Sequence, residues 1–320
     1  MDAKIELGQS TQELLRCPVC ESKLVLSDSQ FRCVNATCKS VFPIVDGIPI
    51  LINESSSVFS IADFVHKSNT FFKPTSRMVR LLVNIMPDIS RNLRAKRNYQ
   101  KFAELLLEKN ENPRVLVVGG SILGFGMQRI LEIPAIELIE GDVSFGPRTR
   151  LIFDAHDIPL ESNSMDGVIV QAVLEHVVNP HRCVEEIHRV LKERGLVYAE
   201  TPFMQQVHGG RYDFTRFTHL GHRLLFQKFE EISSGAVAGP GTALAWSYRY
   251  FLLSFSKSQA LRALLGGFIR LTAFWLKYFD YYLIDKTSAF DGASAFYFMG
   301  RKTNQTTSPR ELIQLYRGAV

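Results

Sequence analysis

The feature that most constrains the fold is an apolar run that ends in a glycine-rich turn. Residues 115–118 are all apolar, as is typical of a buried parallel strand, and glycines follow at positions 119, 120, 124 and 126. A turn without side chains lets backbone N–H groups approach a ligand closely. A second strand-like stretch, residues 136–142, ends in Asp142, a carboxylate placed to accept hydrogen bonds from a ribose. The pattern predicts a nucleoside-cofactor site, although such turns also occur with structural roles alone.

The glycine spacing narrows the class of cofactor. No register of these glycines fits Gly-x-Gly-x-x-Gly, and the loop has no Lys or Arg before Arg129, so a pyrophosphate ligand is not expected. A sulfonium ligand such as S-adenosylmethionine needs only a closely approaching backbone, a carboxylate for the ribose and a slot for the adenine. This sequence pattern fits such a ligand better than a pyrophosphate cofactor. Glu140 competes with Asp142 for the ribose because strand alternation places both side chains on one side, and we favour Asp142.

Five separated motifs follow in order between Asp154 and Gly195. They include Asp154-Ala155, Asp166-Gly-Val, Leu174-Glu-His-Val and Glu186-Ile-His-Arg-Val-Leu-Lys. Together they resemble the class I S-adenosylmethionine-dependent methyltransferases of the type 11 group, over about residues 112–235 with a closing strand near 294–301. The resemblance implies an α/β fold, a Rossmann-like seven-stranded sheet with helices on both faces, and a methyltransferase enzyme.

The resemblance also assigns cofactor roles residue by residue. Gly119, Gly120 and Gly124 would approach the methionine moiety, Asp142 would hold the ribose, Asp154 and Ala155 would meet the adenine, and Gln171 would lie near the amino-acid end. One position departs from the family pattern, because the usual acidic residue before the first glycine is Val118 here. The cofactor's amino group would then lack its usual indirect anchor.

Methyl transfer from a sulfonium is an in-line displacement on an activated donor, so positioning the acceptor supplies much of the rate. A base is needed only for a weakly acidic acceptor such as a hydroxyl. The first candidate is Glu175-His176, after the fourth strand at the carboxyl edge of the sheet. Some related quinone O-methyltransferases carry a metal-binding Glu-x-x-Glu-His, but Ala172 occupies the first of those positions here, so we expect no metal. The alternative for His176 is packing of the cofactor loop.

The second candidate is the long segment 201–219 after the fifth strand, because loops at this edge usually build the acceptor pocket. Its Tyr-Asp-Phe-Thr-Arg-Phe-Thr resembles a motif of bacterial methyltransferases encoded with glycan-biosynthesis enzymes. We therefore take His176, His208 and Asp213 as catalytic candidates, and an Asp213–Arg216 ion pair that locks the loop is the alternative. The expected acceptor is a small molecule or a glycan, such as a lipid-linked saccharide oxygen.

Four cysteines near the amino terminus predict a closed structural zinc site on a hairpin. The proposed ligands are Cys17, Cys20, Cys33 and Cys38. Residues 41–51 resemble the small zinc-ribbon family that activates and stabilises certain methyltransferases. Disulfides are the alternative, but residues 1–12 contain no apolar leader, so export is not expected. Cys183 is expected in the core.

The chain has 320 residues, which is more than a single hydrophobic core usually accommodates. The expected organisation is a zinc ribbon at 1–52, linker and cap helices at 53–112, a methyltransferase core at 113–303 with an apolar insertion at 239–285, and a tail at 304–320 with one or two helical turns. From the cap region, Phe71, Phe72 and Tyr99 are candidate pocket walls.

Composition and charge favour a cytoplasmic enzyme over a protein that binds nucleic acid. The net charge of +5 becomes about +3 once four thiolates and a zinc ion are counted. The basic run 91–97 could contact RNA, but a solvated helix face is the favoured interpretation. A non-catalytic scaffold that binds a protein or RNA partner through the ribbon is the alternative to an enzyme.

The insertion contains the longest apolar stretch, residues 261–284, interrupted by four charged residues that fall on one helical stripe: Arg262, Arg270, Lys277 and Asp280. These charges argue against a membrane span and predict one amphipathic helix. Three uses of its apolar face stay open, namely packing on the core, dimerisation, or lying at the inner face of a membrane near a lipid-linked acceptor. The oligomeric state is undetermined.

Overall fold

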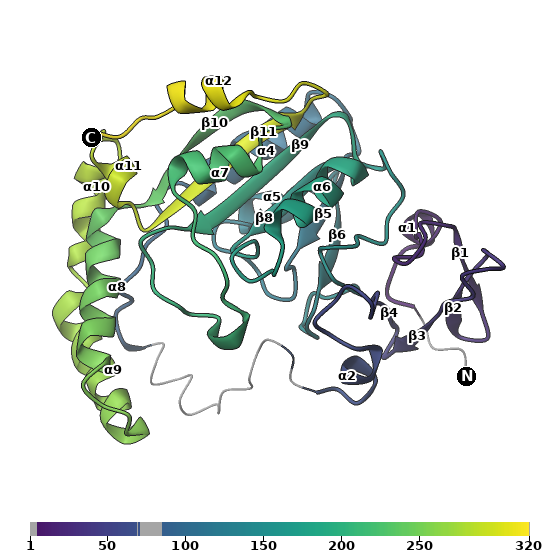
Figure 1. Ribbon diagram of the computed structural model, residues 1–320, viewed down its shortest axis with the longest axis horizontal. Helices are drawn as coiled ribbons and strands as arrows, with labels where there is room; N and C mark the ends of the chain where they lie inside the picture. Colours follow the sequence, from purple (N-terminus) through teal and green to yellow (C-terminus); the bar gives the residue numbers. More distant parts are fainter. Residues whose placement is uncertain (1–4, 69, 71–84, 320) are drawn as a thin grey trace.

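The computed structural model describes residues 5–68, 70 and 85–319. In this part of the chain the strands form one sheet, in the order β1-β2-β3-β4-β7-β6-β5-β8-β9-β11-β10. Phe71 and Phe72 lie outside the described residues, so their expected place in a pocket wall stays a prediction. Figure 1 shows the sheet at the centre, the β1–β3 segment at one end and the helices α8 and α9 at the other.

Seven strands make up the main sheet. They are β5 (Arg114–Val118), β6 (Glu137–Asp142), β7 (Leu151–Phe153), β8 (Met165–Gln171), β9 (Leu191–Pro202), β10 (Phe229–Ala238) and β11 (Ala295–Lys302). Strands β5 to β9 pair in parallel, whereas β11 runs antiparallel between β9 and β10. The expected seven-stranded α/β sheet is confirmed. Parallel pairing brings the carboxyl ends of β5 to β9 to one edge, which is where ligands of such sheets bind.

The helices are short apart from four. The elements are α1 (Gln9–Gln12), α2 (Ile61–Val65), α4 (Ala95–Leu107), α5 (Gln128–Leu131), α6 (Pro180–Val190), α7 (His219–Leu225), α8 (Pro240–Leu253), α9 (Gln259–Ala273), α10 (Asp280–Leu283), α11 (Ala289–Gly292) and α12 (Pro309–Gln314), with 3-10 turns η1 (Gly210–Tyr212) and η2 (Leu276–Phe279). Local chemistry explains the start of α6, where the Asn179 side chain accepts from the Arg182 N–H at 3.1 Å and Pro180 takes the first helical position. The tail forms one short helix, as expected.

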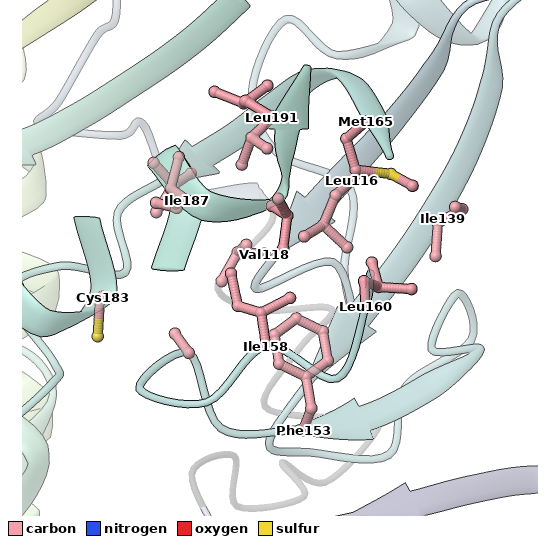
Figure 2. Packing of buried hydrophobic residues seen from close by; sticks show 14 of the residues in the cluster. Leu116, Val118, Ile139, Phe153, Ile158, Leu160, Met165, Cys183, Ile187 and Leu191 are labelled. Atoms are coloured by element: carbon pink, nitrogen blue, oxygen red, sulfur yellow. The ribbon is translucent and has the colours of Figure 1, made fainter. Parts of the chain in front are cut away.

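Two apolar clusters cover the two faces of the sheet. Because side chains alternate along a strand, Leu116 and Val118 of β5 point into the cluster under α6, whereas Val115 and Val117 point into the cluster under α4. Figure 2 shows the first cluster, with Cys183 of α6 among its buried members. The expectation that Cys183 is a core residue is confirmed.

The amino-terminal segment is built into the same sheet. Its strands are β1 (Leu24–Ser27), β2 (Gln30–Cys33), β3 (Val41–Val45) and β4 (Ile48–Leu51), and β3 turns into β4 through Asp46-Gly47, both with positive φ as a tight hairpin requires. Strand β4 pairs in parallel with β7. Leu15, Phe31 and Phe42 share a buried cluster with Phe153. Sheet and core therefore continue across the boundary we place at residue 52, because so short a segment buries too little apolar surface by itself.

The insertion differs from the expectation of one helix over residues 261–284. Helix α9 ends at Ala273, and η2 and α10 follow as separate turns. The break has a polar cause: Asp280 is fully buried and accepts from the N–H groups of Gly239, Gly241 and Thr242 at the start of α8, at 2.7–3.1 Å. Lys277 is also buried and donates to the Asp88 carbonyl. Two of the four stripe charges thus face the protein, and the prediction of a single amphipathic helix is wrong.

Candidate functional site

Two cavities open at the edge where the parallel strands end. The first cavity has an empty volume of about 740 Å³, including its open mouth. It is lined by Val58, Phe59, Val118, Gly119, Gly141, Asp142, Val143, Phe153, Asp154, Ala155, His156, Ala172, Val173, His176, Val177, Val178 and Tyr212. Four of the seven residues that the sequence assigns to the cofactor are in this lining.

The glycine turn after β5 closes tightly against its neighbours. Gly119 has φ +78°, and a Cβ there would lie 2.4 Å from Val173 Cγ2. Gly120 and Gly124 do not line the cavity. A Cβ atom added to Gly120 would lie only 3.1 Å from the Cβ atom of Glu140. A Cβ atom added to Gly124 would overlap the side-chain amide oxygen of Gln171. Gly119 therefore faces the cavity, and the other two glycines allow the turn to pack from behind.

The two acidic residues of β6 have different surroundings. Asp142 lies in the cavity wall and accepts from the Ser121 N–H at 3.0 Å, and burial raises its pKa. Glu140 is paired with Arg148, with 2.5 Å between Oε1 and Nε, and is absent from the cavity lining. Of the two competing carboxylates, only Asp142 is placed to meet a ligand in this cavity.

Asp154 at the end of β7 is held on both oxygens. Oδ1 accepts a hydrogen bond from the backbone N–H of His156 at 3.0 Å and also contacts the His156 ring. Oδ2 accepts a hydrogen bond from the Ser57 hydroxyl at 2.5 Å. Burial alone would raise the pKa of Asp154, but these hydrogen bonds outweigh it and lower the pKa. The linker after β4 thus reaches the cofactor edge, and Val58 and Phe59 line the cavity.

The sequence predicted a linker here, but Val58 and Phe59 were not among the expected pocket walls. Phe59 packs on Tyr212 with ring centroids 5.5 Å apart, so two segments distant in sequence form one wall of the cavity. The signal in the sequence is the apolar pair Val58-Phe59 within a polar linker.

Gln171, at the end of β8, belongs to a buried polar network. It accepts from the Tyr99 hydroxyl at 3.1 Å and donates to Glu200 at 2.9 Å. Glu200 also accepts from Asn92 at 2.8 Å and from the Tyr198 hydroxyl. Burial raises the pKa of Glu200 to about 7. Tyr99 is fully buried against Tyr198 and lines neither cavity.

The second cavity lies beside the first and has an empty volume of about 590 Å³. It is lined by Ser90, Arg91, Asn92, Ala172, Glu175, Glu200, Thr201, Pro202, Gln205, His208, Val237, Ala238, Thr242, Ser294 and Ala295. Three of these residues, Glu175, Thr201 and Ser294, carry buried side-chain oxygens that have no hydrogen-bond partner in the described part of the chain. Glu200 at the end of β9 was not among the sequence candidates, although a carboxylate closing an apolar strand is a signal for it.

His176 and His208 meet at Glu175. Each Nε2 lies 3.7 Å from Glu175 Oε1, and the two rings are edge-on with centroids 4.9 Å apart. Asp213 lies on the other side of His208, with its Oδ2 3.6 Å from His208 Nδ1, and is not part of this three-residue cluster. Its carboxylate is paired with Arg216 and accepts from the backbone N–H groups of His208 and Gly209 at 2.7 and 2.9 Å.

The environment of Asp213 makes it a poor proton acceptor. Although burial would raise its pKa, the Arg216 guanidinium and the two backbone N–H groups hold the pKa of Asp213 far below its usual range. The loop-locking ion pair that we weighed as the alternative is present. Asp213 fixes the loop that presents His208.

The four amino-terminal cysteines converge. Their Sγ atoms lie within 4.8 Å of one another, with Cys17 to Cys38 at 3.8 Å and Cys20 to Cys33 at 3.4 Å. Zinc–thiolate bonds of about 2.3 Å in a tetrahedron separate sulfurs by roughly 3.8 Å. The cluster therefore fits a tetrahedral structural zinc ion.

Comparison with known proteins assigns both parts of the chain. A family model described as a methyltransferase domain matches residues 137–199, from β6 into β9. A UPF0434 protein of Alteromonas mediterranea is 41% identical over 49 residues, 15% of this chain and 77% of that protein. The chain is a methyltransferase that carries an amino-terminal UPF0434 segment.

Solved structures also resemble this methyltransferase. The 1,6-didemethyltoxoflavin-N1-methyltransferase of Burkholderia thailandensis aligns with a TM-score of 0.41 and 13% identity over 85% of this chain and 98% of that one. Phosphoethanolamine N-methyltransferase 2 of Haemonchus contortus aligns with a TM-score of 0.39 and 15% identity over 64% of this chain and 53% of that one. Such values say nothing about the acceptor of the present methyltransferase.

The cofactors of the methyltransferase are S-adenosylmethionine and a structural zinc ion. The first cavity fits the former, because it places a side-chain-free backbone at Gly119 beside the buried carboxylate of Asp142. Val118 lines the same cavity where the family carries an acidic residue, so no carboxylate stands at that point of the wall. The cysteine cluster fits the zinc ion.

Proposed function

We propose that the methyltransferase transfers a methyl group from S-adenosylmethionine in the first cavity to a hydroxyl oxygen of a polar acceptor in the second. The acceptor class that we favour is a glycan or a lipid-linked saccharide. One observation carries the proposal: Ala172 lines both cavities, so a donor and an acceptor would meet at the end of β8. Ala172 also has φ +55°, a left-handed conformation that is uncommon for residues other than glycine.

The residues of the first cavity have separate roles in this proposal. The Gly119 backbone would approach the methionine moiety, Asp142 would accept from the ribose hydroxyls, and Asp154 and Ala155 would bound the adenine slot. Gly120, Gly124 and Gln171 would act indirectly, because their contacts are with other protein groups. They would position the turn and the end of β8.

Polar groups within the largely apolar lining of the second cavity support an acceptor that carries a hydroxyl. Buried polar groups are normally hydrogen-bonded. The side-chain oxygens of Thr201 and Ser294 have no such partner among the described residues, so a bound ligand could form hydrogen bonds with them. S-adenosylmethionine supplies a methyl group already activated by its sulfonium. Transfer breaks the methyl–sulfur bond, forms a methyl–oxygen bond and releases the hydroxyl proton. Glu200, with a pKa of about 7 and a place in this lining, is the proposed acceptor of that proton.

The insertion supports a membrane partner. Its outer surface exposes large apolar side chains, among them Leu244, Phe251, Phe255, Leu264, Phe268, Leu271, Trp275, Tyr278 and Tyr282. Residues 240–284 contain five basic residues and a single acidic one, the buried Asp280. Aromatic side chains bordered by basic ones are typical of proteins that lie on anionic bilayers. Pairing two such faces in a dimer would oppose like charges.

We therefore propose that α8, α9 and the turns after them, at one end of the molecule in Figure 1, rest on an anionic membrane surface. Among the described residues, no helix has the length and hydropathy needed to cross a bilayer. Thr242, at the start of α8, lines the second cavity, so this orientation would bring a lipid-linked saccharide towards it.

Calorimetric titration with S-adenosylmethionine and its demethylated product tests the donor half of the proposal. The native chain should bind both. Asp142→Ala should weaken binding by about tenfold or more, because loss of a charge-assisted hydrogen bond costs roughly 1.5–3 kcal/mol. Glu140→Ala is the matched control, since Glu140 lies on the same strand outside the cavity, and it should bind as the native chain does.

Failure of the native chain to bind either compound would overturn the assignment of the donor to the first cavity and favour the alternative of a scaffold that binds a protein or RNA partner through the ribbon. Equal losses in the two variants would place the ribose elsewhere on β6.

A further inference from the structure

The carboxylate of Glu175 is the most unusual group at this site. Its side chain is fully buried, and neither oxygen has a hydrogen-bond partner in the part of the chain that the structure describes. Removing an ionised carboxylate from water is costly unless a cation or several donors replace the water. Nε2 of His176 and Nε2 of His208 each lie 3.7 Å from the Glu175 Oε1 atom.

The opposite nitrogens of both imidazoles face hydrogen-bond acceptors. His176 Nδ1 lies 2.8 Å from the Tyr212 carbonyl oxygen, and His208 Nδ1 lies 3.3 Å from the Gln206 carbonyl oxygen. A neutral imidazole carries one proton, and these carbonyls draw it to Nδ1. Each Nε2 then presents a lone pair towards the Glu175 carboxylate. Two lone pairs and an anion at this spacing repel one another, so the cluster calls for a positive charge. Burial alone would lower the pKa of His208, but the Glu175 carboxylate raises it, and a metal ion held by all three groups would take the place of that proton.

The site is held in this geometry from outside. Asp213 accepts from the backbone of His208 and Gly209, and a Cβ on Gly209 would lie 2.5 Å from the His176 ring. The Arg216 guanidinium, 3.5 Å from His208 Nδ1, is engaged by Asp213 and the Gln205 carbonyl. Such outer contacts, which fix the orientation and tautomer of each ring, are typical of metal-ligating histidines.

We propose that Glu175 Oε1, His176 Nε2 and His208 Nε2 bind one divalent transition-metal ion of the zinc type. The three ligand atoms lie within 4.8 Å of one another. Bonds of about 2.0–2.2 Å in a tetrahedron would place them roughly 3.4 Å apart, so small side-chain movements would complete the site. Two histidines and one carboxylate leave a fourth position open, as in catalytic rather than structural zinc sites.

The role of this ion rests on the proposed function. Glu175 and His208 line the second cavity, and His176 lines the first, so the open position would lie where the two cavities meet. A hydroxyl of the acceptor bound there would have its pKa lowered, which eases the loss of its proton to Glu200.

Metal counting on the full chain tests the site directly. After dialysis against zinc and then metal-free buffer, the native chain should retain about two zinc ions, one of them in the cysteine cluster. Glu175→Gln and His208→Ala should each retain about one, and their calorimetric affinity for added Zn²⁺ should fall by at least about 100-fold. The exposed His181→Ala is the control and should retain two. Circular dichroism checks that each variant is folded.

A native chain that retains one zinc ion and shows no heat with Zn²⁺, Co²⁺ or Mn²⁺ would overturn the proposal. So would a second ion that both variants keep. These outcomes are separate from those for the donor: a chain that binds S-adenosylmethionine but no second metal keeps the proposed function and loses this site, and the converse result keeps the site.

Discussion

At the scale of single residues, surroundings rather than residue type separate the carboxylates of this site. Glu200 lies near the carboxyl end of β9, and Asp213 lies in the loop that follows this strand. Arg216 and two backbone N–H groups keep Asp213 ionised, whereas burial raises the pKa of Glu200 to about 7. The sequence identifies the loop that carries Asp213 but not which acid can exchange a proton, because that property depends on neighbours distant in sequence.

Glu200 provides a prediction at this scale. A base must be deprotonated to work, so the rate of methyl transfer should rise with pH through about 7 and then level off. Glu200→Gln should lower the rate by about 10²- to 10⁴-fold and abolish that rise, with S-adenosylmethionine affinity little changed. Steady-state rates between pH 5.5 and 8.5 measure both effects.

Glu230→Gln, on the exposed part of β10 and paired with Arg194, is the control and should keep the native profile. A Glu200→Gln variant that retains the pH dependence would assign the titrating group elsewhere.

At the scale of elements, residues 261–284 do not divide into one charged outer face and one apolar inner face, because Ile269 and Ala273 are buried together with two of the charged residues. An exposed helix usually turns charges to water and apolar residues to the core. Here Lys277 and Asp280 are buried, and Leu264, Leu271 and Tyr282 are exposed. Periodicity identifies two faces but cannot say which one meets the protein, and the acceptors and donors that satisfy Asp280 and Lys277 belong to other segments.

Removal of the Asp280 carboxylate should destabilise this element. Asp280→Ala leaves the Gly239, Gly241 and Thr242 N–H groups buried without a partner and removes the cap of α8. We expect the free energy of unfolding to fall by about 2–4 kcal/mol. Urea denaturation measures it. Asp285→Ala, which removes an exposed partner of Arg94, should change it by less than about 0.5 kcal/mol, and equal effects would refute the capping role.

The membrane proposal predicts selective binding to anionic vesicles. The native chain should sediment with phosphatidylglycerol-containing vesicles and not with pure phosphatidylcholine. A triple variant, Phe251→Ser, Phe255→Ser and Leu264→Ser, removes exposed apolar area and should weaken this partition by at least about tenfold. Ile313→Ser, on exposed apolar surface of α12, is the control. A stable dimer without vesicle binding would contradict the proposal.

At the scale of the whole molecule, the ribbon and the methyltransferase core form one sheet and one apolar interior. Strand β4 extends the sheet beyond β7, and Ser57, six residues after β4, donates to Asp154 at the cofactor edge. Folding of the zinc site and formation of the first cavity should therefore be coupled, because both depend on the position of β4.

Loss of the zinc site tests this coupling. Cys33→Ser should retain one zinc ion fewer than the native chain and lower the free energy of unfolding by at least about 3 kcal/mol, since a structural zinc site contributes to folding directly. Binding of S-adenosylmethionine should weaken in parallel. Elemental analysis, urea denaturation and calorimetry measure these changes. Cys183→Ser, in the core away from the cluster, should keep the zinc ion. Native affinity in a zinc-deficient chain would show that ribbon and donor site are independent.

The sequence by itself determined the features that depend on local pattern. Apolar runs, a glycine turn and ordered motifs predicted the α/β sheet, the methyltransferase domain and the zinc cluster, because strand burial, turn geometry and ligand spacing are short-range properties. Only the tertiary structure brought His208 to Glu175 and His176, placed Phe59 in the cofactor cavity and turned Asp280 inward. Those arrangements depend on contacts between segments far apart in the chain, for which no local spacing carries a code.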